Sequence, residues 1–354
     1  MENTAIANAV MAIRPIIASF DSTGSTDVSY DKIEWDRSFG VGHPTLHERR
    51  SQMKSGIDRR QFLKLAGIGG VVYASGLTGF ANAAEKKTVG EDFVFVQLSD
   101  THWGFKDEKV NPDWNGTLKK AVAAVNELES KPEFIVFTGD LSHTTDDPKE
   151  RRKRLSEFRD IAADLKVRDI RYMPGEHDAS LDNGDAFKEF FGATHYTFDH
   201  KGVHFIVLDN VSDPAASIGE AQLAWLADDL KKLDTEKMIT VLTHRPLFDL
   251  YPQWDWATRD GAKAVELLMP FKHVTVFYGH IHQEHHQMTR HIPHHAAHGL
   301  MYPLPGPGSV PKKAPVPWDP EHPYKGLGFR GLKALAGSSE YRIQEYPVRK
   351  GDSA

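Results

Sequence analysis

Five apolar runs in this chain each end at residue types that bind metals, and this recurring pattern constrains the fold more than any other feature. The first run covers residues 93–98, is rich in Val and Phe, and leads directly to Asp100 and His102. A short apolar run of this kind is typical of a strand buried on both faces. In open α/β sheets the chemically active residues gather at the carboxyl ends of such strands. The pattern therefore predicts an α/β sheet with a polar site at one edge.

The other four runs end in the same way. In chain order, the polar residues that follow them are Asp140 after residues 134–137, Glu176, His177 and Asp178 after 170–173, His244 after 238–242, and His280 and His282 after 274–278. One Asp-x-His pair is a weak signal, because a capped turn with a solvated His explains it. Five such endings in one chain are poorly explained by independent turns, and they predict one cluster of carboxylates and imidazoles.

Helical patterns separate the predicted strands. Apolar residues recur at helical spacing over residues 117–128, 156–165 and 219–233, and the stripe of the last segment is interpreted as core. Two short strands, 196–198 and 204–208, flank a hairpin signal and predict antiparallel pairing, and residues 341–346 predict a final edge strand. Strands that alternate with helices indicate a layered α/β domain.

Composition excludes several classes of protein and site. The chain has 354 residues, of which 26% are charged, and a net charge of −6, as in an ordinary globular protein of one large or two modest domains. This charge gives no indication of a nucleic-acid or anionic-membrane partner. Cysteine is absent, which excludes disulfides and thiolate metal sites, whereas histidine is abundant at 19 residues.

The ordered set of strand endings resembles the calcineurin-like metallophosphoesterases over about residues 93–286. The resemblance implies a four-layer α/β/β/α sandwich with two facing mixed β-sheets, and a metal-dependent phosphoric ester hydrolase. It also implies two metal ions. Carboxylate and imidazole ligands without thiolate suit Mn, Fe, Zn or Co, and a pair of such ions can activate water and clamp a phosphoryl group.

The resemblance assigns a role to each residue of the set. It implies that Asp100, His102 and His282 hold the first metal, that Asp140 bridges both, that Glu176, His244 and His280 hold the second, that His177 is the general acid or orients phosphate, and that Asp178 holds the His177 ring. A hydroxide between the ions would attack the phosphorus in line. The expected substrate is a small-molecule phosphate ester, with a phosphodiester favoured.

One position departs from the family pattern, since Glu176 stands where these proteins normally have Asn. A neutral amide both binds metal and donates to phosphate, whereas a carboxylate only accepts and repels an anion at short range. Two alternatives to a phosphodiesterase therefore stay open. They are a phosphomonoesterase and a non-catalytic periplasmic protein that binds metal or another ligand on the same scaffold.

Further segments are candidates for substrate or metal contacts. His143 would touch phosphate or cap a turn, while Tyr251 and Trp254 would stack on a flat leaving group or pack on their own domain. The histidine-rich run 285–298 would line the mouth of the site or form an additional metal site. Residues 301–324 contain eight Pro and predict an extended segment wrapped over the domain.

The N-terminal region divides into two parts. Residues 1–52 are interpreted as a disordered leader or as a mis-assigned start before Met53. Residues 53–83 resemble a twin-arginine export signal, with Arg59 and Arg60, a short apolar segment and small residues before Ala84. We therefore expect a phosphoesterase domain over residues 84–300, completed by residues 301–354, which is exported by the twin-arginine machinery to the periplasm or beyond. The apolar segment is too short for the ~20 residues of a stable membrane anchor.

Overall fold

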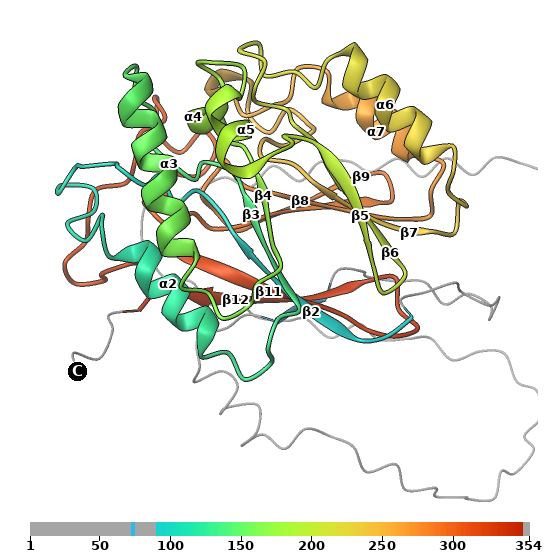
Figure 1. The fold of residues 1–354 in the computed structure, drawn as a ribbon, viewed down its shortest axis with the longest axis horizontal. Coiled ribbons are helices and arrows are strands. Elements are labelled where there is room, and N and C mark those ends of the chain that lie inside the picture. The colour runs from blue at the N-terminus through green and yellow to red at the C-terminus, as the bar shows by residue number, and fades with distance from the viewer. Residues whose placement is uncertain (1–71, 75–89, 350–354) are drawn as a thin grey trace, which may run out of the picture. The chain divides into compact units, whose positions relative to one another are not determined.

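The computed structural model describes residues 72–74 and 90–349, and its described strands form two six-stranded sheets (Figure 1). The first sheet consists, in spatial order, of β1 (Val72–Ala74), β12 (Tyr341–Pro347), β11 (Gly328–Ala334), β2 (Phe93–Leu98), β3 (Phe134–Thr138) and β4 (Ile170–Met173). The strands β2, β3 and β4 are parallel, whereas β11 is antiparallel to both β2 and β12. The first sheet is therefore mixed.

The second sheet is also mixed. It consists, in spatial order, of β5 (Tyr196–His200), β6 (Val203–Val207), β7 (Met238–Leu242), β8 (His273–Tyr278), β10 (Ile292–Ala296) and β9 (His285–Thr289). Strands β6, β7, β8 and β10 are parallel, and β5 and β9 pair antiparallel at the two edges. The predicted hairpin of β5 and β6 is confirmed. Its turn residues Lys201 and Gly202 both have positive φ, as a tight hairpin requires.

Helices cover the outer face of each sheet. The described helices are α2 (Thr117–Asn126), α3 (Pro148–Ala162), α4 (Glu176–Ala179), α5 (Asp185–Phe191), α6 (Glu220–Leu230), α7 (Gly261–Leu268) and the short 3₁₀ helix η1 (Pro252–Trp254), and the longer ones, α2, α3, α6 and α7, form the outer layers. Side chains of α2 and α3 pack with β2 and β3, while those of α6 and α7 pack with β6, β7 and β8. Figure 1 shows these two helix pairs on opposite flanks of the sheets. The predicted four-layer α/β/β/α sandwich is confirmed.

The two sheets pack face to face through aromatic side chains. Phe95 of β2 and Phe134 of β3 are fully buried, and their rings stack with centroids 4.8 Å apart. Phe205 of β6 packs edge-on against both, with centroids at 5.6 Å and 5.3 Å. Edge-to-face and offset-stacked pairs stabilise beyond the area they bury, by about 0.5–1.5 kcal/mol each. This cluster fixes the distance between the sheets and thus the width of the edge where their strands end.

Several expected boundaries differ from the structure. Helix α3 begins at Pro148, eight residues before the expected start, because Asp147 caps it by accepting a hydrogen bond from the Lys149 backbone and Pro148 suits the first helical position. The strand expected at the sheet edge, β12, lies between β11 and β1. The histidine-rich run forms the β9–β10 hairpin with His294 and His295 buried, and none of its residues lines the cavity at the strand ends.

The predicted export signal falls largely outside the described residues. Its described part is β1, which pairs antiparallel with β12. None of the helices in the described part of the chain is long and apolar enough to cross a membrane.

The packing between the sheets predicts the cost of removing one aromatic ring. Replacing Phe95 by Ala should lower the free energy of unfolding by about 3–5 kcal/mol, because the fully enclosed ring leaves a cavity between two rigid sheets. Urea unfolding followed by far-UV circular dichroism measures this change. Leu181→Ala is the control, because that side chain is 49% exposed, and it should change the free energy by less than about 0.5 kcal/mol. Similar values for the two variants would contradict this description of the core.

Candidate metal centre

Four side chains meet at the carboxyl ends of β2, β3 and β8. They are Asp100, His102, Asp140 and His282, with ligand atoms all within 4.8 Å of one another. Nε2 of His282 is 3.3 Å from Oδ1 of Asp100 and 3.1 Å from Nε2 of His102. Nε2 of His102 is in turn 3.5 Å from Oδ2 of Asp140. All four are buried, so the group offers two carboxylates and two imidazoles to one cation.

A second group forms at the ends of β4, β7 and β8 from Glu176, His244 and His280. The Glu176 carboxylate lies against both rings, with Oε2 2.8 Å from Nε2 of His244 and Oε1 2.8 Å from Nδ1 of His280. Within the described residues neither ring nitrogen makes a hydrogen bond of acceptable geometry, although both are buried. Buried nitrogens in this state fit metal ligation, because an imidazole lone pair without a partner is costly.

Asp140 lies between the two groups. Its Oδ2 atom is 3.5 Å from Nε2 of His102 and 3.4 Å from Nε2 of His244, so one oxygen faces both sets of ligands. The combined donors are carboxylate oxygens and imidazole nitrogens, a set that suits Mn, Fe, Zn or Co. The residues present therefore fit a pair of metal ions with Asp140 between them.

Two backbone carbonyls orient the imidazoles from behind. Nδ1 of His244 is 2.7 Å from the Thr138 carbonyl oxygen, and Nδ1 of His282 is 2.6 Å from the Tyr302 carbonyl oxygen. A carbonyl only accepts, so Nδ1 carries the proton in each ring and the Nε2 lone pair faces the carboxylates. Metal-binding histidines typically have such a partner on the second nitrogen, because it fixes the tautomer and the ring orientation.

The backbone is strained where the ligands converge. The φ angle is positive at Asp100 (55°), His102 (40°), Asp140 (50°), His280 (66°) and His282 (52°). A residue with a Cβ atom is uncommon in this left-handed region, and each instance costs on the order of 1–3 kcal/mol. Strain of this kind persists where the surrounding structure imposes it, and here it turns side chains from five strand-end positions toward one point.

Two glycines allow the strand ends to approach. Gly139 has φ of 93°, and a Cβ atom there would overlap the His244 ring. A Cβ atom on Gly175 would overlap the carboxylate and backbone nitrogen of Asp140. The loops after β3 and β4 can therefore bring Asp140 and Glu176 together only with glycine at these positions.

The profile of the calcineurin-like phosphoesterases matches residues 93–284, more than half of the chain and all seven residues of the two groups. The chain belongs to this family. It is a metal-dependent phosphoric ester hydrolase by family, and its buried Asp and His clusters are consistent with the dimetal site typical of that family.

Individual relatives of this phosphoesterase carry different names. A serine/threonine-protein phosphatase CPPED1 of Danio rerio is 26% identical over 56% of this chain and 73% of its own length. A probable cyclic nucleotide phosphodiesterase of Rhodopseudomonas palustris is 25% identical over 59% of this chain and 78% of its own length. A purple acid phosphatase from yellow lupin has the same fold, with a TM-score of 0.51 and 15% identity over 75% of this chain and 53% of that chain.

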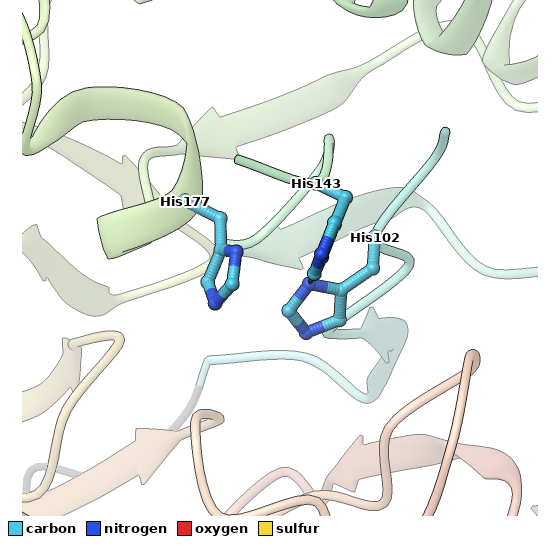
Figure 2. A group of neighbouring side chains, drawn as sticks. All are labelled: His102, His143 and His177. Atoms are coloured by element: carbon cyan, nitrogen blue, oxygen red, sulfur yellow. Dashed lines mark hydrogen bonds between the residues drawn. The ribbon is translucent and has the colours of Figure 1, made fainter. Parts of the chain in front are cut away.

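Three histidines lie side by side next to the first ligand group (Figure 2). Nδ1 of His143 is 3.3 Å from Nδ1 of His102, and the His143 and His177 rings stack with centroids 4.8 Å apart. Burial, with the neighbouring His177, lowers the pKa of His143 to about 4, so its imidazole is neutral near pH 7. With Nε2 of His102 as the ligand atom facing Asp140, the proton of a neutral His102 ring is on Nδ1, and Nδ1 of the neutral His143 is placed to accept it. The structure thus gives His143 a third role, neither a phosphate contact nor the cap of a turn.

Asp178 corrects an expectation, because it does not hold the His177 ring. Its carboxylate accepts hydrogen bonds from the backbone nitrogens of Leu141 (2.9 Å), Ser142 (2.7 Å) and Gly175 (3.0 Å). Burial and the charge of Asp140 raise the pKa of Asp178 to about 7. The carboxylate therefore ties the loop after β3 to the start of α4, and so positions Asp140 relative to Glu176.

Thr144, and not Asp178, is the hydrogen-bond partner of the His177 ring. Its backbone N–H donates to Nδ1 of His177 at 3.2 Å, and its hydroxyl lies 2.8 Å from the same atom. Since Nδ1 accepts, the proton of a neutral His177 ring is on Nε2. His177 lines the cavity over the metal ligands, so it presents a hydrogen-bond donor there.

Burial and neighbouring charge set the protonation of the ligands. Burial, together with adjacent imidazoles, lowers the pKa of His102 well below its ordinary value. Burial alone would raise the pKa of Glu176, but the flanking imidazoles of His280 and His244 outweigh it and hold that pKa well below the ordinary value. A neutral His102 and an ionised Glu176 are in the states that bind metals. At His244 and His282 burial alone would lower the pKa, but the adjacent carboxylates outweigh it and raise the pKa of both.

The aromatic loop after β7 packs on its own domain. Trp254 is 5% exposed and lies in a cluster with Trp256, Tyr278 and Ile281. Tyr251 packs edge-on against Trp254, and its ring lies against Gly308 of the Pro-rich segment. The expectation that Trp254 stacks on a substrate is therefore wrong, because other parts of the chain cover its ring. Tyr251 is only half-buried, so its contact with a substrate stays a prediction.

Tyr302 and Lys313 line the cavity over the metal ligands but carry no recognisable motif. The hydroxyl of Tyr302 is 3.3 Å from Nε2 of His102, and its ring stacks on His282 with centroids 4.6 Å apart. Both residues belong to the Pro-rich segment, about 200 positions from His102 along the chain. The composition of that segment indicates only an extended conformation, so sequence alone gave no signal for these contacts.

The contact between His143 and His102 predicts an effect on metal affinity. His143→Ala should weaken binding of the metal held by the first ligand group by about 10–100-fold, because His102 loses the acceptor that fixes its ring. Competition with a chelator, read by elemental analysis of the protein, measures this affinity. His322→Ala is the control, since His322 is exposed and pairs with Asp319. An affinity equal to that of the unmodified protein would show that His143 does not position His102.

Proposed function

We propose that this chain is an exported phosphodiesterase that uses two metal ions to hydrolyse a small-molecule phosphodiester. The single observation that carries the hydrolytic assignment is the pair of buried ligand groups that share Asp140, in a chain of this family. The preference for a diester draws support from relatives named as phosphodiesterases, among them one of Mycobacterium tuberculosis named for cAMP and cGMP that is 29% identical over 44% of this chain and 51% of its own length.

Each ligand group would hold one ion. Asp100, His102 and His282 would hold the first and Glu176, His244 and His280 the second, with Asp140 shared between them. Once bound, such ions supply Lewis-acid activation of water and neutralise charge on the phosphoryl group. The chain itself holds the ligands in their metal-binding tautomers through the Thr138 and Tyr302 carbonyls.

His177 would orient the substrate. Its Nδ1 accepts from the Thr144 backbone, so its Nε2–H points a donor at the cavity in the neutral ring. A donor there suits a non-bridging phosphoryl oxygen or the oxygen of the leaving group. This geometry favours the phosphate-orienting role over that of a general acid, because a protonated ring would bring an Nδ1 proton against the Thr144 N–H.

Hydrolysis of two model esters tests the proposed function. The protein from residue 84 onward, loaded with Mn, Fe, Zn or Co, should hydrolyse bis-p-nitrophenyl phosphate faster than p-nitrophenyl phosphate. Asp140→Asn should lower kcat at least about 10³-fold and also lower the metal content, because both groups lose their shared oxygen. Asp160→Asn, an exposed carboxylate on α3, is the control.

The outcomes separate the alternatives. Preference for the monoester would support a phosphomonoesterase. Two bound metals without turnover of either ester would contradict the diester proposal and favour a non-catalytic binding protein.

Export is a separate part of the proposal. It rests on Arg59 and Arg60 before a short apolar segment and on the small residues before Ala84. Cleavage there would remove β1 and leave β12 at the edge of the first sheet. In a bacterial host with twin-arginine transport, the periplasmic protein should begin at Ala84, as N-terminal sequencing would show.

Arginine substitutions give the matched test of export. Replacing Arg59 and Arg60 by Lys should retain the protein in the cytoplasm, whereas the same change at the nearby pair Arg49 and Arg50 should not. Equal export of the two variants would contradict a twin-arginine signal at Arg59 and Arg60.

A further inference from the structure

The cavity over the metal ligands has a floor and a roof from different parts of the chain. The floor is made by strand-end residues, which are His102, Asp140, Glu176, His177, His280 and His282. The roof is made by the Pro-rich segment through Tyr302, Leu304, Lys313, Ala314 and Pro315. The volume of this partly open cavity is about 130 Å³, below the roughly 300–1,000 Å³ of common ligand sites. The segment therefore restricts the space above the ligands.

The Pro-rich segment is fixed on both sides of Lys313. The Val316 nitrogen donates to the Pro303 carbonyl (3.0 Å), which joins the two arms of the segment. The Gln283 side chain donates to the Pro305 carbonyl (2.8 Å), and the Trp318 nitrogen donates to the Lys109 carbonyl (2.8 Å). These contacts link the segment to the loops after β8 and β2, so the position of Lys313 is set by the fold.

Lys313 is a half-buried cation with no anionic partner among the described residues. Its Nζ atom lies 5.8 Å from the centroid of the Trp256 ring, which shields one side of the ammonium group. The neighbouring cation Arg245 is already occupied, since it donates to the Asp255 carboxylate and to the Ala257 carbonyl. Burial lowers the pKa of Lys313 from its ordinary value, while the negative charge of Glu176 acts in the opposite direction. Among the described residues that line the cavity, Lys313 is thus the cation that is free to bind an anionic ligand.

The charge of the ligand set explains why such a cation matters. Three carboxylates, those of Asp100, Asp140 and Glu176, stand against two metal ions. With two divalent ions bound, the formal net charge of the ions and the three carboxylates together is only +1. Glu176 also lines the cavity that a phosphate must enter. A carboxylate repels an anion at short range and offers it no donor. An ammonium group in the same cavity wall offsets that repulsion and supplies three donors.

We propose that Lys313 binds an anionic oxygen of the substrate's phosphate group and so offsets the charge of Glu176 in the cavity wall. This inference rests on the proposed function, because it names a binding residue of the same site. The substrate class is accordingly a small phosphate ester whose phosphate enters beneath the Pro-rich segment. A hydrogen bond between two charged groups in such a place corresponds to about 10–100-fold in affinity.

Phosphate binding to the metal-loaded protein tests the proposal without requiring turnover. Lys313→Met should weaken orthophosphate binding by about 10–100-fold in calorimetry and raise KM more than it changes kcat, with metal content unaltered. Lys312→Met is the matched control, because Lys312 is the exposed neighbour and does not line the cavity. Lys313→Arg should restore part of the affinity. Equal affinities for Lys313→Met and the unmodified protein, or equal losses for the two methionine variants, would overturn the proposal.

A double variant tests the link to Glu176. Glu176→Gln removes the repulsion, so Glu176→Gln combined with Lys313→Met should bind orthophosphate within about threefold of the unmodified protein at saturating metal. If the double variant binds orthophosphate as weakly as Lys313→Met alone, Lys313 does not offset the charge of Glu176, and the proposal is overturned. A protein that binds phosphate through Lys313 but cleaves no ester would contradict the proposed function alone. Failure of the unmodified, metal-loaded protein to bind orthophosphate would overturn the role of Lys313.

Discussion

The carboxylate of Asp140 lies between two groups of buried ligands, and the arrangement of the strand ends depends on holding it there. Buried carboxylates are costly unless opposite charge compensates them, and this site holds two of them, Asp100 and Asp140, beside the partly buried Glu176. The imidazoles of His102 and His244 approach the same Asp140 oxygen from two different sheets. Cations bound at this point would satisfy the carboxylates, so metal binding and the stability of this edge of the fold are linked.

The cost of this convergence is distributed over the surrounding backbone. Left-handed backbone at five ligand positions turns the side chains inward, and the glycines at 139 and 175 remove the atoms that would keep the loops apart. Asp178 then joins those loops through three backbone amides. The sequence suggests that Asp178 is a partner of the His177 ring, but its carboxylate instead joins two loops and fixes the positions of Asp140 and Glu176.

The roof and the floor of the cavity over the metal ligands are formed by different segments of the chain. Strand ends supply the ligands, whereas the Pro-rich segment supplies Tyr302 and Lys313 and narrows the cavity to about 130 Å³. Tyr302 contributes in two ways, since its carbonyl orients His282 and its hydroxyl approaches His102. The same segment therefore holds one ligand in its metal-binding form and lies over the place where a phosphate group would enter.

The layered α/β class, most of the strands and the seven candidate ligands could be predicted from the sequence, because each of these features is a local pattern. An apolar run predicts a buried strand, and polar residues after it predict a place at the sheet edge. The sequence did not reveal β11, because Gly328–Ala334 has no clear apolar periodicity.

The contacts of Asp178, His143 and Trp254, and the place of Lys313 in the cavity wall, depend on the tertiary structure. Their partners lie on other loops, and Lys313 reaches a cavity whose floor comes from strands that precede it in the chain. The physical reason is that a local pattern records what a segment buries, whereas a hydrogen bond or charge contact between distant loops depends on how the two sheets bring those loops together.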